Sequence, residues 1–222
     1  MSTVPVPFDK IQGWFFDLDG TLMDTDNQAV ESLARRLKFL GPARANRLAR
    51  RLVMAGETPV NGALTALDMM GLDAVLFGLR RMIGSHSEPT FRIIAGVKPM
   101  LAHLAERAQL AVVSTRAEAE AVAFLRQHEL TDFFKLIVTQ ATTKRLKPHP
   151  EPVLYAAEHL GLTPDVCAMV GDTPVDVLSG RRAGAWAIGV LCGFGEEAEL
   201  WRAGAHQVLP STVDLLSLVK HP

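Results

Sequence analysis

Six short apolar runs recur along the chain, and each has the length of one β-strand. Most of the stretches between them show apolar residues at every third or fourth position, as on the buried face of a helix. The six runs, in chain order, are GWFFD (13–17), LAVVS (110–114), FKLIVT (134–139), VCAMVGD (166–172), AWAIGV (185–190) and HQVLP (206–210). Because strands alternating with helices favour a parallel sheet covered on both faces, we predict a doubly wound, Rossmann-like α/β fold.

The interval between the first two runs is much longer than one helical crossover requires. About 90 residues separate these runs, whereas a strand-helix-strand unit needs only about 30. Four helical patterns, each bounded by Gly or Pro, occupy the interval at residues 27–40, 43–56, 61–70 and 72–84. We therefore predict two domains: an α/β core made of residues 1–24 and 97–222, and an inserted α-helical cap made of residues 25–96.

Composition and charge narrow the possible partners. The 222 residues are 48% hydrophobic and 21% charged, which is ordinary for a soluble globular protein. A net charge of −1 gives no overall field that would attract nucleic acid or an anionic membrane. No apolar run reaches the roughly 18 residues of a membrane span, and the first residues lack the pattern of a signal peptide. We expect a cytoplasmic monomer or homodimer with no nucleic-acid or membrane partner.

The first apolar run leads into two acids, Asp17 and Asp19. Residues two apart on a strand point to the same side, so the two carboxylates would repel each other unless a cation lies nearby. Carboxylate oxygens suit Mg²⁺, which commonly accompanies phosphate. Gly20 permits a tight turn, and Thr21 offers a hydroxyl and an amide to an anion. The segment predicts a magnesium and phosphate site, the alternative being a strand followed by an acidic Asp-Gly turn.

Four segments resemble, in order, the motifs of the haloacid dehalogenase superfamily: DLDGTLMDT, AVVST, LKPHPEP and MVGDTPVD. The size and position of the insert, and the late segment GVLCGFGEEAEL, resemble the phosphoglycolate phosphatase-like branch with its helical C1-type cap. This resemblance implies a Mg²⁺-dependent phosphatase, a phosphoric monoester hydrolase, whose partner is a small phosphorylated metabolite. It also implies that Asp17 attacks phosphorus to form an aspartyl-phosphate. Asp19 would protonate the leaving oxygen and then activate water.

The second and third motifs supply candidates for phosphate binding. The Ser114 hydroxyl and the Thr115 amide can donate to phosphate oxygens, and Gly20 and Thr21 of the first motif are assigned to the same group. Arg116 follows the Ser-Thr pair, where relatives often have Asn before a small residue; we predict it as a further phosphate-binding residue. Lys147 is a compact cation that can neutralise both the nucleophile and the transferring phosphoryl group.

The fourth motif completes a predicted metal site. Asp172 follows an apolar strand and Gly171, as Asp17 follows its own strand, so Asp17, Asp19 and Asp172 are the predicted Mg²⁺ ligands. Asp176 lies one helical turn beyond Asp172 as a supporting residue. It could hold a metal-bound water, orient Lys147, or favour the positive helix N-terminus.

Two other functions remain open at this point. A sugar phosphomutase would share every core motif and differ mainly in the cap, although the Thr-Arg-Gly cap signature of β-phosphoglucomutase-like members is not found. A catalytically idle binding or regulatory domain could also retain the fold. Turnover of a generic aryl phosphate with Mg²⁺ separates the idle domain from an enzyme.

Overall fold

The computed structural model describes residues 5–24, 37, 41 and 91–219. One compact unit of the chain comprises Met1–Thr25 and Arg92–Pro222, and it carries every strand and helix reported below. The predicted cap, residues 25–96, lies outside the described residues except for residues 37, 41 and 91–96. Its helices therefore stay a prediction.

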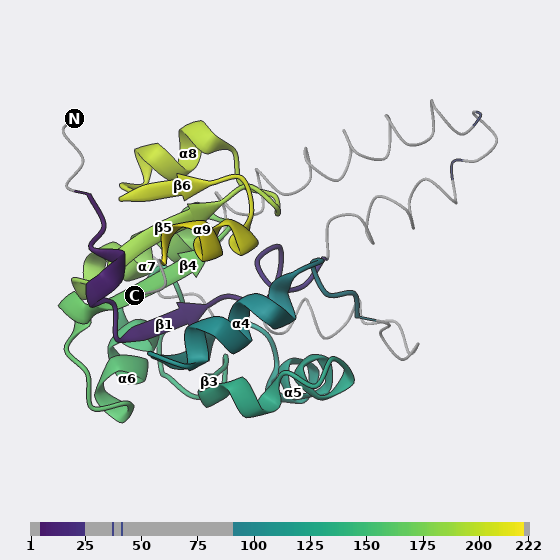
Figure 1. Ribbon diagram of the computed structural model, residues 1–222, viewed down its shortest axis with the longest axis horizontal. Coiled ribbons are helices and arrows are strands. Elements are labelled where there is room, and N and C mark those ends of the chain that lie inside the picture. The colour runs from purple at the N-terminus through teal and green to yellow at the C-terminus, as the bar shows by residue number, and fades with distance from the viewer. Residues whose placement is uncertain (1–4, 25–36, 38–40, 42–90, 220–222) are drawn as a thin grey trace. The chain divides into compact units, whose positions relative to one another are not determined.

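A six-stranded parallel sheet forms the centre of this unit (Figure 1). The strand order is β3-β2-β1-β4-β5-β6, so the chain moves outward from β1 in one direction and then returns to continue in the other. The strands are β1 (Gly13–Phe16), β2 (Gln109–Val113), β3 (Phe134–Val138), β4 (Cys167–Gly171), β5 (Trp186–Val190) and β6 (Gln207–Leu209). The predicted doubly wound α/β fold is confirmed, and all six predicted strands occur.

Helices and single 3₁₀ turns connect the strands. The α-helices are α4 (Val97–Ala105), α5 (Glu118–Gln127), α6 (Glu151–His159), α7 (Pro174–Ala183), α8 (Glu197–Arg202) and α9 (Leu215–Leu218). The 3₁₀ turns are η1 (Phe8–Lys10), η3 (Thr131–Phe133), η4 (Pro164–Val166) and η5 (Thr212–Asp214). Among the described residues, no helix combines the length and the apolar character that a membrane crossing requires.

The core explains why β1 is apolar along its whole length. Every residue of β1 is buried, as expected for a central strand that is covered on both faces. On one face, α6 packs Val153, Ala156 and Ala157 against Phe15 and Val113. A strand buried in this way holds the backbone that follows it in a fixed position.

The carboxyl ends of three neighbouring strands bring predicted site residues to one edge of the sheet. Asp17, Ser114 and Asp172 directly follow β1, β2 and β4. The Asp17 amide still donates to the Val170 carbonyl at 3.0 Å, so the ladder between β1 and β4 continues to the site. The edge at which these residues meet is where open α/β sheets bind ligands.

Candidate active site

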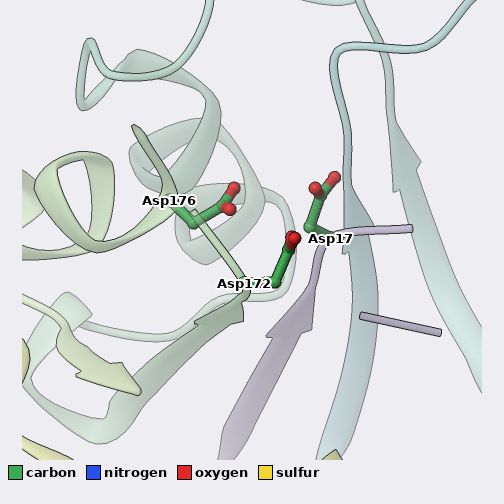
Figure 2. Close-up of side chains that lie close together, drawn as sticks. All are labelled: Asp17, Asp172 and Asp176. Atoms are coloured by element: carbon green, nitrogen blue, oxygen red, sulfur yellow. The ribbon is translucent and has the colours of Figure 1, made fainter. Parts of the chain in front are cut away.

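Three buried carboxylates converge at this edge. One oxygen each from Asp17, Asp172 and Asp176 lies within 4.8 Å of the others. Figure 2 shows that Asp17 comes from the end of β1, Asp172 from the end of β4 and Asp176 from the adjoining helix, α7. Buried like charges at this spacing need cations or hydrogen-bond donors to be stable.

Lys147 supplies one of these cations. Its Nζ donates to Asp176 Oδ1 at 2.6 Å and to the Val113 carbonyl at 2.7 Å, and it lies 2.9 Å from Asp17 Oδ1. Burial alone would lower the pKa of Lys147, but Asp17 and Asp176 outweigh it and raise that pKa above its usual value. The lysine is therefore a charged, fixed group between the two acids.

Asp17 is the least satisfied of the three acids. Its Oδ1 lies at ion-pair distance from Lys147 Nζ, but among the described residues no donor meets that oxygen with hydrogen-bond geometry. Burial raises the pKa of Asp17 to about 7; Lys147 opposes this shift, while Asp176 and Asp19 add to it. Asp17 therefore presents a buried, poorly solvated carboxylate oxygen at the carboxyl edge of the sheet.

Asp172 is held by donors that come from distant parts of the chain. Its Oδ1 accepts a hydrogen bond from the Thr21 hydroxyl at 3.3 Å, and its Oδ2 accepts one from the Phe194 amide at 2.9 Å. A Cβ atom at Gly193 would lie 2.1 Å from Asp172 Oδ2, and one at Gly195 would lie 1.8 Å from the Asp172 carbonyl oxygen. These two glycines let the Phe194 amide reach the carboxylate, a role that the sequence motif did not reveal.

Gly20 also lies close to the carboxylate of Asp172. Its φ is +66°, and a Cβ atom there would lie 2.3 Å from Asp172 Oδ2. The residue was predicted to permit a tight turn, and the structure places it in that turn and against Asp172. Any side chain at this position would be strained and would also collide with Asp172.

Both carboxylate oxygens of Asp176 accept hydrogen bonds. Its Oδ1 accepts from Lys147, and its Oδ2 accepts from the Thr173 amide at 3.1 Å and the Thr173 hydroxyl at 2.6 Å. This arrangement is a capping box at the start of α7. Two of the three predicted roles of Asp176 match these contacts. Asp176 orients Lys147, and it caps the N-terminus of α7.

The predicted phosphate-binding residues lie beside the acids. The Ser114 hydroxyl is buried and accepts a hydrogen bond from the Arg116 amide at 3.2 Å, which leaves its own proton able to point to an anion. Thr115 is adjacent and half-buried. The Thr21 hydroxyl donates to Asp172, and the Thr21 amide donates to the Leu18 carbonyl at 3.2 Å. Phosphate binding by these residues stays a prediction.

Arg116 contacts Asp19, which is 97 positions away in the sequence. Its Nε and Nη2 atoms donate to the two carboxylate oxygens of Asp19, each at 2.6 Å. Its Nη1 atom donates to Glu120 Oε2 at 2.7 Å. The sequence analysis assigned Arg116 to phosphate and did not anticipate this bidentate pair.

Comparison with known proteins identifies the family. A model of the family described as haloacid dehalogenase-like hydrolase matches residues 14–190. The chain belongs to this family. In addition, this haloacid dehalogenase-like hydrolase is 29% identical over 206 residues to pyrophosphatase PpaX of Anoxybacillus flavithermus, covering 92% of this chain and 94% of the relative. It is 30% identical over 227 residues to a phosphoglycolate phosphatase of Nitrosospira multiformis, covering 97% of each chain.

Solved structures agree on the fold of this haloacid dehalogenase-like hydrolase. A Thermotoga maritima protein, provisionally named a β-phosphoglucomutase, superposes with a TM-score of 0.62 at 20% identity. The match covers 94% of this chain and 98% of the other. At this identity the likeness establishes the common fold, so the chemistry has to be argued from the site itself.

The site of this haloacid dehalogenase-like hydrolase fits a divalent cation. No donor among the described residues meets Asp17 Oδ1 with hydrogen-bond geometry, and one carboxylate oxygen of Asp172 lies within 4.8 Å of one of Asp17. Oxygen ligands of this kind suit hard divalent ions. Asp176 is the weaker ligand of the three, because three hydrogen bonds already occupy its two oxygens.

Proposed function

We propose that this haloacid dehalogenase-like hydrolase is a Mg²⁺-dependent phosphatase that removes the phosphoryl group from a small metabolite through an aspartyl-phosphate at Asp17. The observation that carries the proposal is the state of Asp17. It is a buried carboxylate at a strand end, 2.9 Å from a charged lysine, with one oxygen that accepts no hydrogen bond from the described residues. Such an oxygen is poorly solvated and therefore nucleophilic.

Asp17 and Asp172, together with the backbone carbonyl of Asp19, would hold the cation. Its chemistry is the neutralisation of negative charge on the acids and on the incoming phosphoryl group. Lys147 adds a further positive charge, and its contacts with Val113 and Asp176 keep it in place. Ser114 and Thr115 would then hold the phosphate oxygens by donating hydrogen bonds.

The reaction proceeds in two displacements. In the first, an Asp17 oxygen forms a bond to phosphorus while the bond from phosphorus to the leaving oxygen breaks, and Asp19 gives its proton to that oxygen. In the second, Asp19 takes a proton from water, the water oxygen bonds to phosphorus, and the bond to Asp17 breaks. Inorganic phosphate leaves, and both acids return to their initial states.

The relatives suggest which substrates to test first. One is named a pyrophosphatase and another a phosphoglycolate phosphatase, so small compounds with a terminal phosphoryl group form the substrate class that we propose. The residues predicted to form the cap, 25–96, would select among such compounds. A screen that compares kcat/KM across phosphorylated metabolites, pyrophosphate and phosphoglycolate included, ranks the candidates.

One experiment tests the proposal directly. The purified protein is mixed with a ³²P-labelled substrate and Mg²⁺ and quenched within milliseconds, and the labelled residue is then identified. We expect transient label on Asp17, none in the Asp17→Asn variant, and release of inorganic phosphate. Absence of turnover across the whole screen would indicate an idle domain, and transfer of the label to a second hydroxyl of a sugar phosphate would indicate a mutase.

A further inference from the structure

Arg116 lies between two carboxylates that belong to different parts of the fold. Asp19 is in the loop after β1, and Glu120 is in the first turn of α5. The guanidinium meets Asp19 with two hydrogen bonds of 2.6 Å and Glu120 with one of 2.7 Å. The Arg116 side chain is 17% exposed, whereas that of Asp19 is 33% exposed.

We propose that Arg116 is a positioning residue that fixes the orientation of the Asp19 carboxylate for proton transfer. The inference rests on the proposed function, in which Asp19 moves the proton. It assigns to Arg116 a task that differs from the phosphate binding predicted from the sequence. The structural feature that carries it is the paired contact from Nε and Nη2 to the two oxygens of Asp19.

Two parallel hydrogen bonds constrain a carboxylate more than one does. A single donor leaves the carboxylate plane able to rotate, whereas the guanidinium fork fixes both the position and the plane. Asp19 needs this constraint because its side chain is one-third exposed, and a partly exposed carboxylate otherwise exchanges between rotamers. Misplacing a proton donor by about 1 Å can cost on the order of 100-fold in rate.

The backbone of Arg116 is itself anchored. Its amide donates to the Ser114 hydroxyl at 3.2 Å, and its carbonyl accepts from the Gln140 amide at 3.2 Å. One residue therefore connects the predicted phosphate-binding hydroxyl to the predicted proton donor. The distance between these two groups is then set by the Arg116 backbone and side chain together.

Glu120 acts on the other side of the guanidinium. It is four residues after Arg116 in the chain, and its side chain is 51% exposed. Its contact with Nη1 turns the fork so that Nε and Nη2 face Asp19. Because Glu120 is exposed to water, its own contribution is expected to be small.

The test compares two kinds of leaving group. An alkyl phosphate needs protonation of its leaving oxygen, whereas p-nitrophenyl phosphate needs little, so a fault in proton donation slows the first substrate more. For Arg116→Met we expect kcat on the alkyl phosphate to fall by about 10- to 100-fold, with KM changed by less than about threefold. In rapid-quench experiments with p-nitrophenyl phosphate, phosphoenzyme formation should keep most of its rate, and hydrolysis of the phosphoenzyme should slow.

Three further variants separate orientation from charge and from general damage. Arg116→Lys keeps the charge but lacks the fork, so it should show the same split between leaving groups as Arg116→Met. In an Asp19→Asn background, Arg116→Met should cause little further loss, because a residue that acts through Asp19 has nothing left to position. Arg126→Met removes an exposed arginine from the last turn of α5 and should leave turnover of both substrates unaffected.

The outcomes distinguish the inference from the function on which it rests. A raised KM with unchanged kcat would assign Arg116 to substrate binding and overturn the inference. Equal losses in the rate of phosphoenzyme formation from the two substrates, or full additivity with Asp19→Asn, would also overturn it, because both indicate a role outside proton transfer. Failure of the wild-type protein to form any phosphoenzyme would instead overturn the proposed function.

Discussion

Asp17, the proposed nucleophile, should destabilise the metal-free protein at neutral pH. Asp17 is buried, and its pKa is raised from 3.8 to about 7. The folded chain therefore keeps the Asp17 proton over a pH range in which the unfolded chain has lost it. The stability gained in this way is complete below the unfolded pKa and is lost as the pH rises through the folded pKa.

The size of this loss follows from the pKa difference. A shift of about three pH units corresponds to about 4 kcal/mol in total, at about 1.4 kcal/mol per unit. Roughly 2–3 kcal/mol of it falls between pH 5 and pH 8, because the folded pKa lies inside that interval. Asp17→Asn removes the titrating group and should remove this part of the pH dependence.

The assay is urea unfolding in EDTA at pH 5, 6, 7 and 8. The free energy of unfolding of Asp17→Asn, relative to that of the wild-type protein, should increase with pH by roughly 2–3 kcal/mol over this range. Asp132→Asn changes an exposed aspartate in η3 and should follow the wild-type pH dependence. Added Mg²⁺ should stabilise the wild-type protein more than Asp17→Asn, because a ligand that binds the folded state stabilises it by mass action. Identical pH profiles for Asp17→Asn and the wild-type protein would refute the assignment of Asp17 as a buried, poorly compensated acid.

Three other predictions concern catalysis and the support of the site. Asp19→Asn should lower kcat by roughly 10²- to 10⁴-fold and let phosphoenzyme accumulate with an aryl phosphate, as measured by rapid-quench labelling; a fully active, unlabelled variant would contradict the role of Asp19. EDTA should abolish turnover and Mg²⁺ should restore it, whereas Ca²⁺ should inhibit because its looser coordination misplaces the nucleophile; full activity in excess EDTA would remove the metal from the mechanism. Gly195→Ala should weaken Mg²⁺ binding, measured by calorimetry, and lower the Tm, because its Cβ would lie 1.8 Å from the Asp172 carbonyl oxygen; unchanged values would show that the loop relaxes freely.

The fold was predictable because its signals are local. Each strand is a short apolar run, and a run followed by a polar site residue marks the carboxyl end of a strand. The bounds of α7 follow from single residues in the same way: Thr173 caps its start, Pro174 occupies its first position, and Gly184 ends it with a φ of +81°. Such signals act within a few residues, so they can be recognised before the chain is folded.

Contacts that the sequence did not reveal join residues far apart in the chain. The Arg116–Asp19 pair forms because the loop after β1 lies beside the loop after β2 in the folded chain. The local sequence pattern of either loop does not predict this contact. The amide of Phe194 reaches Asp172 for a similar reason. The GFG sequence at residues 193–195 could be recognised as a turn, but the residue that this turn contacts is set by the order of the strands in the sheet.

The four acids of the site differ most in how completely the protein satisfies them. Asp176 accepts three hydrogen bonds, and Asp19 accepts two from a guanidinium. Asp17 keeps an oxygen that no described donor meets with hydrogen-bond geometry. A fully bonded carboxylate is a poor nucleophile because its lone pairs are engaged, whereas an unsatisfied one is reactive and costs stability. Under the proposed function, the oxygen that costs the metal-free fold stability is the one that attacks phosphorus, so Asp17→Asn should remove the reaction along with that cost.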